Sequence, residues 1–214
     1  MKCKMPARLS SDGSLAMSQI TLITGGCRSG KSRYAQRLSE KIGERRLFIA
    51  TAPVLDEEMR QRVAWHRAER GGRGWDTWEE QHDLVGCLRR IDRQSRERPQ
   101  ERDAGYDVVL CDCLTLWTNN LLYAASRKGI FLEEQEMVSL AREVCVAARA
   151  ISAPVFFVTN EVGQGIVPAD ALSRRFRDLV GRCNQEVAAA ADSVVLMVSG
   201  LPLPLKGPNH ANSP

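Results

Sequence analysis

The sequence predicts an α/β fold, namely an open and mostly parallel β-sheet with helices on both faces. Short and mostly apolar runs recur at residues 19–24, 46–51, 107–112, 154–160 and 193–199. Runs that lack strict polar alternation are typical of strands buried on both faces. Loops that follow the carboxyl ends of such strands form the binding crevice of open α/β sheets. We therefore expect the functional residues in those loops.

Helical stretches separate these runs. Residues 32–42 follow the first run and residues 56–70 follow the second, whereas 132–151 and 170–191 precede the fourth and the fifth. The resulting βαβα order favours right-handed crossovers between parallel strands. Residues 88–103 are dense in Arg, Asp, Glu and Gln, which predicts a solvated helix and loop.

The chain of 214 residues predicts one domain, over residues 19–200. Residues 1–18 are rich in Ser and show no periodicity, so we expect a disordered extension. Residues 201–214 carry repeated prolines, which exclude helix and interior strand, and we expect a loose tail.

Composition excludes several classes of protein. With 43% hydrophobic and 26% charged residues, the chain is typical of folded soluble proteins. We expect neither a signal peptide nor a membrane span, since no apolar run approaches the roughly 18 residues that a span needs. The seven cysteines form no C-x-x-C pair, which favours reduced thiols and a cytoplasmic protein. A net charge of +4 decides nothing about nucleic acid by itself.

A glycine-rich motif between the first run and the first helix carries the clearest chemistry. It matches G-x-x-x-x-G-K-[ST] at every fixed position. Its glycines let the backbone wrap around phosphate oxygens, while successive amides and the helix N-terminus supply positive charge. We expect a nucleoside triphosphate here, on a P-loop NTPase-like (RecA-like) fold. The motif comprises Gly25, Gly26, Cys27, Arg28, Ser29, Gly30, Lys31 and Ser32.

Two side chains of the motif have predicted tasks, and a third residue completes the site. Lys31 neutralises the outer phosphates as a catalytic residue, and the Ser32 hydroxyl is a ligand for Mg²⁺. Asp112 ends the apolar run that starts at Asp107, where such sites place an acidic metal ligand. Taken alone, Asp112 is more often a turn or cap residue. The glycine motif makes the metal role the stronger reading.

His66 is the centre of a second candidate cluster. The predicted helix 56–70 begins acidic and ends basic, as the helix dipole favours. Arg62, Arg67 and Arg70 surround His66 in sequence, and nearby cations keep an imidazole neutral and nucleophilic. From the residues alone, a structural role for His66 remains the more common case.

Longer motifs resemble one known family. They are T-G-G-C-R-S-G-K-S-R from Thr24, L-D-E-E-M-R-Q-R-V-A-W-H-R from Leu55, C-D-C-L-T-L-W-T-N-N-L-L from Cys111 and V-T-N-E-V-G-Q-G-I-V-P from Val158. Together they are similar to the bifunctional adenosylcobinamide kinases and adenosylcobinamide-phosphate guanylyltransferases of cobalamin biosynthesis. The resemblance covers about residues 18–206.

The resemblance implies two reactions and their substrates. Adenosylcobinamide is phosphorylated with ATP or GTP, and GMP from GTP is then transferred to adenosylcobinamide phosphate, releasing pyrophosphate. It also implies that His66 becomes covalently guanylylated, although Trp65 stands where members often have another histidine. A homotrimer is the expected assembly.

The resemblance further assigns guanine nucleotide contacts outside the glycine motif. Some members carry Glu where this chain has Asp112, which shortens the reach to the metal by one methylene. The implied contacts are Ala50, Thr51, Ala52, Arg67, Ala68, Glu69, Arg70, Glu79 and Asp112.

Two other functions remain open. A different small-molecule kinase of the same fold would use the glycine motif and Asp112 without a covalent histidine intermediate. A nucleic-acid-binding ATPase would use the arginines of residues 60–73 to follow phosphates. The few aromatic residues and the acids at 56, 57, 58 and 69 disfavour the second, so we expect no nucleic acid partner.

Overall fold

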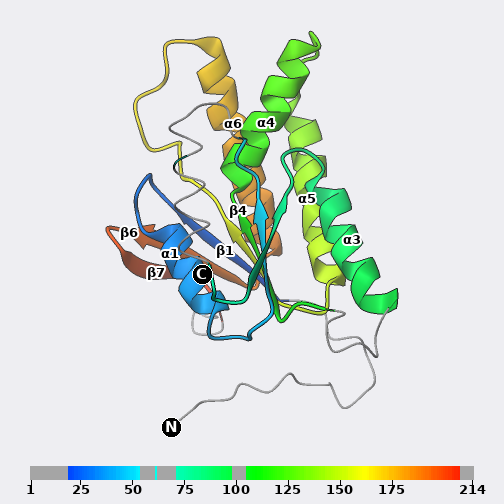
Figure 1. Ribbon diagram of the computed structural model, residues 1–214. Coiled ribbons are helices and arrows are strands. Elements are labelled where there is room, and N and C mark those ends of the chain that lie inside the picture. Colours follow the sequence, from blue (N-terminus) through cyan, green and yellow to red (C-terminus); the bar gives the residue numbers. More distant parts are fainter. Residues whose placement is uncertain (1–18, 54–60, 62–70, 98–104, 208–214) are drawn as a thin grey trace.

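A seven-stranded sheet forms the centre of the structure, a computed structural model that describes residues 19–53, 61, 71–97 and 105–207 (Figure 1). The strand order is β3-β2-β4-β5-β1-β6-β7, with β7 antiparallel to β6 and every other pair parallel. The predicted α/β class is confirmed. The strands are β1 (Ile20–Gly25), β2 (Arg46–Ala50), β3 (Trp75–Glu79), β4 (Val108–Asp112), β5 (Val155–Val158), β6 (Ser193–Val198) and β7 (Leu201–Lys206).

Helices cover both faces of the sheet, as predicted (Figure 1). Helix α1 packs on one face, and helices α3 to α6 pack on the other. The bounds are α1 (Lys31–Ser39), α3 (Leu84–Glu97), α4 (Leu114–Arg127), α5 (Glu134–Ala150) and α6 (Ala171–Ala190).

Alternation of side chains along the strands builds one core on each face. In β1, Leu22 joins the apolar cluster under α3 to α6, whereas its neighbour Ile23 joins the cluster under α1. Both are almost completely buried. Successive strand residues point to opposite faces, so a strand covered on both sides is apolar at most of its positions. This explains the continuous apolar runs in the sequence.

Strand β3 and helix α4 were not predicted. β3 is an edge strand of the sequence Trp-Asp-Thr-Trp-Glu, and its half-exposed residues form no apolar run. α4 has no side-chain cap at Cys113 and no acidic residue in its first turn, so the usual start signals are missing. A solvated helix and loop was expected at residues 88–103. The helix is present as α3, but it begins earlier, at Leu84, and one face that includes Leu88 and Ile91 is buried.

Residues 201–206 form strand β7, so the loose tail predicted there was wrong. Pro202 and Pro204 lack the N–H that a central strand would need, but β7 lies at the edge of the sheet, where proline is tolerated. The turn to β7 has Ser199 at φ 51° and Gly200 at φ 84°. Two positive φ values are typical of the type I′ turns that close two-residue hairpins. Residues 1–18 and 208–214 lie outside the described residues.

Two further predictions concern membrane-spanning helices and the state of the cysteines. Among the described residues, no helix is long and apolar enough to cross a membrane. The six cysteines of the described part of the chain are all free thiols.

Candidate nucleotide-binding site

The glycine motif forms a loop between β1 and α1, with its amides at the start of the helix. Arg28 adopts φ 56° and Gly30 adopts φ 91°, which turns the chain from the strand into the helix. The Ser29 N–H donates to the Gly26 carbonyl (3.3 Å), and the Tyr34 N–H to the Gly30 carbonyl (2.9 Å), which starts α1. A helix N-terminus preceded by such a loop attracts anions through its free N–H groups and its dipole. The loop therefore has the backbone shape that the predicted phosphate cradle requires.

Lys31 lies above this cradle. Its Nζ donates a hydrogen bond to the Gly26 carbonyl (3.1 Å), which folds the side chain back over the loop. Burial raises the pKa of the Cys113 thiol to about 12, the charge of Asp112 acts in the same direction, and Lys31 acts against both. Lys31 is therefore within electrostatic range of the end of β4, where Asp112 lies.

Asp112 stands at the carboxyl end of β4, in a row with two other predicted residues. Ala50 of β2 pairs in register with Asp112 on one side and with Glu79 of β3 on the other. Ala50 and Asp112 lie 62 positions apart in the sequence, yet the row brings them together at one edge of the sheet. The structure therefore places Ala50, Glu79 and Asp112 side by side, as a shared site requires.

Thr51 fixes the chain just beyond that row. Its N–H donates to the Asp112 carbonyl (3.3 Å), its hydroxyl donates to the Cys113 carbonyl (2.8 Å), and the Cys113 N–H donates back to the hydroxyl (2.7 Å). Asn120 of α4 donates to the carbonyls of Thr51 (2.8 Å) and Gln81 (3.0 Å). These bonds tie the ends of β2, β3 and β4 together, so the Ala50–Ala52 segment is held rigidly.

The β6–β7 hairpin supports the glycine loop from the other side. The Gly200 N–H donates to the Ser29 carbonyl (2.9 Å), so the hairpin turn rests directly on the loop. A Cβ on Gly25 would meet the Met197 carbonyl at 2.5 Å, which explains why glycine occupies the first position of the motif. The sequence signal for this support was the Ser199-Gly200 pair, which is a common turn dipeptide.

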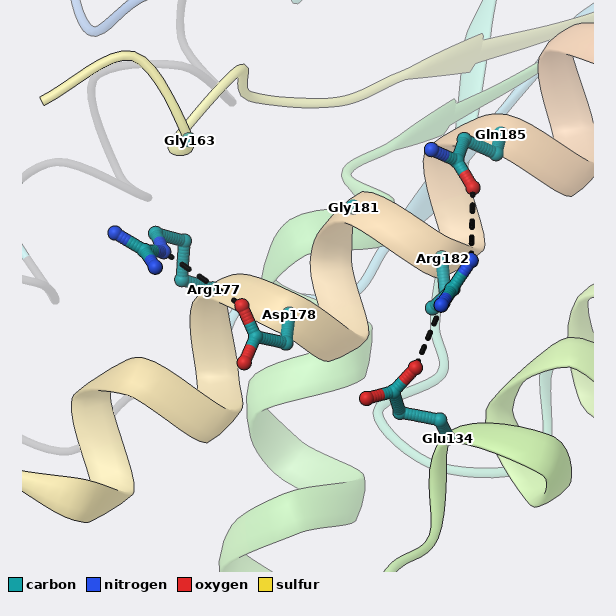
Figure 2. A pocket seen from close by; sticks show the side chains of 7 residues that line it. All are labelled: Glu134, Gly163, Arg177, Asp178, Gly181, Arg182 and Gln185. Carbon is teal, nitrogen blue, oxygen red and sulfur yellow. Dashed lines mark hydrogen bonds and ion pairs between the residues drawn. The ribbon is translucent and has the colours of Figure 1, made fainter. Parts of the chain in front are cut away.

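Two surface pockets flank this edge of the sheet. The first, of about 350 Å³, lies along α6 beneath the loop at Gly163 (Figure 2). Its charges are paired, with Arg182 at 2.7 Å from Glu134 and Arg177 at 3.7 Å from Asp178. Paired charges do not favour a triphosphate, so we do not include this pocket in the nucleotide site.

The second pocket, of about 540 Å³, adjoins the carboxyl ends of β2 and β3. It is lined by amide side chains, an exposed tyrosine ring and two cations at the end of α4. The sequence reasoning did not identify these residues as a group. They are Pro53, Gln81, His82, Asn119, Asn120, Tyr123, Ala124, Arg127 and Lys128.

The second predicted cluster falls outside the described part of the chain. His66, together with Arg67, Ala68, Glu69 and Arg70, lies within residues 62–70. The described flank at Pro53 follows β2 at the same edge of the sheet as the glycine loop. The roles of these residues stay predictions.

Known proteins are similar to this chain over most of its length. A family model described as cobinamide kinase / cobinamide phosphate guanyltransferase matches residues 21–205. The bifunctional adenosylcobalamin biosynthesis protein CobP of Pseudomonas aeruginosa is 39% identical over 186 residues, covering 87% of this chain and 96% of the relative. The corresponding protein CobU of Salmonella typhimurium is 39% identical over 196 residues, covering 87% and 99%.

A solved structure is similar at a lower level. It is the flagellar accessory protein FlaH from Methanocaldococcus jannaschii, at 12% identity and a TM-score of 0.47, with 92% of this chain and 81% of that chain covered. The match of the family model to nearly the whole described fold, and the identity to the two relatives, lead to one conclusion. This chain belongs to the cobinamide kinase / cobinamide phosphate guanyltransferase family.

Proposed function

We propose that this chain phosphorylates adenosylcobinamide with ATP or GTP and then transfers GMP from GTP to the resulting phosphate. The products are adenosylcobinamide-GDP and pyrophosphate. The observation that carries the proposal is the shared edge of the sheet, where the glycine loop and the row of Ala50, Glu79 and Asp112 lie together. The family membership supports both reactions.

In the kinase step, the glycine loop holds the triphosphate and Lys31 carries part of the charge on the outer phosphates. Transfer of a phosphoryl group needs little covalent help from the protein, so positioning and charge stabilisation supply most of the rate. The N-terminus of α1 and the Lys31 ammonium both act on the β- and γ-phosphates in this arrangement.

Ser32 and Asp112 would hold Mg²⁺, which would neutralise charge that develops on the phosphates. A hydroxyl and a carboxylate are hard oxygen ligands, which suit this ion. Among the described residues, no group of three or more His, Cys, Asp or Glu side chains gathers to hold a metal.

In the second step, His66 attacks the α-phosphorus of GTP, and the bond to the bridging oxygen breaks with release of pyrophosphate. The phosphate of adenosylcobinamide phosphate then attacks the guanylyl-histidine and regenerates the imidazole. We assign guanine nucleotide contacts to residues 67–70 (Arg67, Ala68, Glu69 and Arg70), to residues 50–52 and to Glu79. The position of Ala50 and Glu79 in one row supports the last two assignments.

A labelling experiment tests the covalent step. Wild-type protein incubated with GTP labelled at the α-phosphate and Mg²⁺ should retain an adduct that acid removes and base does not, as expected of a phosphoramidate. The His66→Ala variant should retain none. The His82→Ala variant is the matched control, because the backbone carbonyl of His82, rather than its ring, binds Trp117. Active wild-type protein without any adduct would favour a small-molecule kinase that lacks the transferase step.

We further propose a homotrimer in the cytoplasm, consistent with free thiols and with the use of ATP and GTP. Sedimentation of the purified protein would measure the assembly. Strong retention on DNA that falls steeply as salt is added would favour the nucleic-acid reading instead, whereas weak retention that does not depend on salt would dismiss it.

A further inference from the structure

Asn160 lies at the end of β5, between the glycine-loop strand and the Asp112 strand. The sheet order places β5 between β4 and β1. Val158 pairs with Asp112 of β4 and with Ile23 of β1, and the Glu161 N–H donates to the Gly25 carbonyl (3.1 Å). The hydrogen-bond ladder between β5 and β1 thus continues past Asn160 to Gly25, the first residue of the glycine loop.

Strand periodicity gives the face on which Asn160 lies. Val158 and Ile23 belong to the apolar cluster under α1, the helix that starts at the glycine loop. Side chains two positions apart on an extended chain share a face. Asn160 therefore lies on the same face of the sheet as Val158 and as Asp112, the register partner of Val158. This is the face that α1 covers.

The backbone of Asn160 is fixed on both sides by side chains of the other face. Its N–H donates to the Thr115 hydroxyl (2.6 Å), and its carbonyl accepts from the Asn184 amide (3.1 Å). Thr159 completes the network through contacts with Thr115 (3.0 Å) and Asn184 (2.7 Å). Helices α4 and α6 thereby hold the backbone that carries the Asn160 side chain.

The side-chain oxygen of Asn160 is buried, yet it accepts no hydrogen bond from the residues that the structure describes. A buried acceptor left unpaired costs about 1–3 kcal/mol, and in folded proteins such a group calls for an explanation. The phosphates of a nucleotide offer acceptors only, so they do not match this oxygen. A hydroxyl group offers the donor that it lacks.

We propose that Asn160 is a catalytic residue of the kinase step, and that its amide oxygen accepts a hydrogen bond from the attacking hydroxyl of the acceptor substrate. The hydroxyl oxygen forms a bond to the γ-phosphorus while the bond to the β,γ-bridging oxygen breaks, and the nucleoside diphosphate leaves with that electron pair. The hydroxyl proton passes to an oxygen of the transferred phosphoryl group. The inference rests on the proposed kinase activity.

The test compares Asn160→Ala, Asn160→Asp and Asn184→Ala with the wild type, using adenosylcobinamide, ATP or GTP, and Mg²⁺. Asn160→Ala should lower kcat by about 100-fold, the cost of a misplaced reacting group. Its Kd for nucleotide should stay within about twofold of the wild type, and its Tm should not fall. Asn160→Asp keeps the size and an acceptor oxygen, so its kcat should lie between those of the wild type and of Asn160→Ala. Asn184→Ala removes bonds within the protein and should lower Tm.

Each contrary result has a distinct meaning. A kcat for Asn160→Ala within about threefold of the wild type overturns the proposal. So does a Kd for nucleotide that weakens in step with kcat, because Asn160 would then bind the nucleotide, and so does a fall in Tm equal to that of Asn184→Ala. An Asp variant no faster than the Ala variant overturns it as well. Wild-type protein that does not phosphorylate adenosylcobinamide would contradict the proposed function instead.

Discussion

Single residues of the glycine loop act through charge and backbone shape more than through packing. Ser29 is almost completely buried, whereas the Lys31 side chain lies over the loop, where its Nζ donates to the Gly26 carbonyl. Truncation of such a cation removes an interaction with phosphates and leaves the core intact. Stability and activity should therefore separate at this position.

Lys31→Ala should lower kcat/KM for the triphosphate by about 100-fold or more, with Tm unchanged within error. Lys41→Ala is the matched control, since Lys41 is an exposed lysine just beyond the other end of α1. Steady-state kinetics and thermal unfolding of both variants provide the measurement. Normal turnover by Lys31→Ala would contradict the assigned role, and equal losses in both variants would indicate a general effect of charge.

At the scale of elements, the β6–β7 hairpin supports the glycine loop although it carries none of the predicted site residues. Its turn donates the Gly200 N–H to the Ser29 carbonyl, and its strand β6 packs Met197 against Gly25. The edge strand β7 anchors that turn through pairing with β6. A substitution in the turn should therefore weaken the binding of the nucleotide phosphates.

Gly200→Ala tests this connection. Gly200 has φ 84°, where alanine is strained by about 1–2 kcal/mol, so the variant should be less stable and should bind nucleotide more weakly. Gly129→Ala is a matched control, because Gly129 has φ 67° and, as at Gly200, an added Cβ meets nothing within 4 Å. Urea unfolding and nucleotide titration should show similar losses of stability but a loss of affinity in Gly200→Ala alone. Equal affinities would contradict support of the loop by the hairpin.

The limits of sequence-based prediction also appear at this scale. Buried parallel strands such as β4, up to its last residue Asp112, and β5 are continuously apolar, so their runs were visible. β3 and β7 are edge strands with exposed faces, and their signal disappears into polar or proline-rich sequence. The glycine motif has fixed spacing and identifies its own site. Asn160 was visible only as part of a longer motif, because its importance depends on a network from two helices distant in sequence.

At the scale of the whole molecule, the two edges of the sheet have different tasks. The carboxyl edge collects the glycine loop, Ala50, Glu79 and Asp112, whereas the amino edge collects interactions that hold the layers together. Asp192 is the centre of the latter, since it accepts from Arg149 of α5 (2.6 and 2.9 Å) and from the Ile20 N–H of β1 (2.7 Å). Stability can therefore be altered there without contact with the site.

Asp192 makes the stability contributed by this edge depend on pH. Burial acts to raise the pKa of its carboxyl, but the hydrogen bonds from Arg149 and the Ile20 N–H outweigh it and lower the pKa below the ordinary 3.8. A carboxyl whose pKa is lower in the folded protein contributes stability above its unfolded pKa, and this contribution is lost as pH falls through the folded pKa.

Asp192→Asn should therefore be less stable than the wild type at pH 7, and the difference should shrink below about pH 4 as the wild-type carboxyl takes up its proton. Asp178→Asn is a matched control, because its ion pair with Arg177 is longer, at 3.7 Å, and half exposed, so we expect a small change. Urea unfolding between pH 3 and pH 7 measures both. A difference that is constant with pH would mean that Asp192 acts through its shape and not its charge. Nucleotide affinity at pH 7 should match the wild type in both variants, because the amino edge lies at the opposite end of the strands from the phosphate loop.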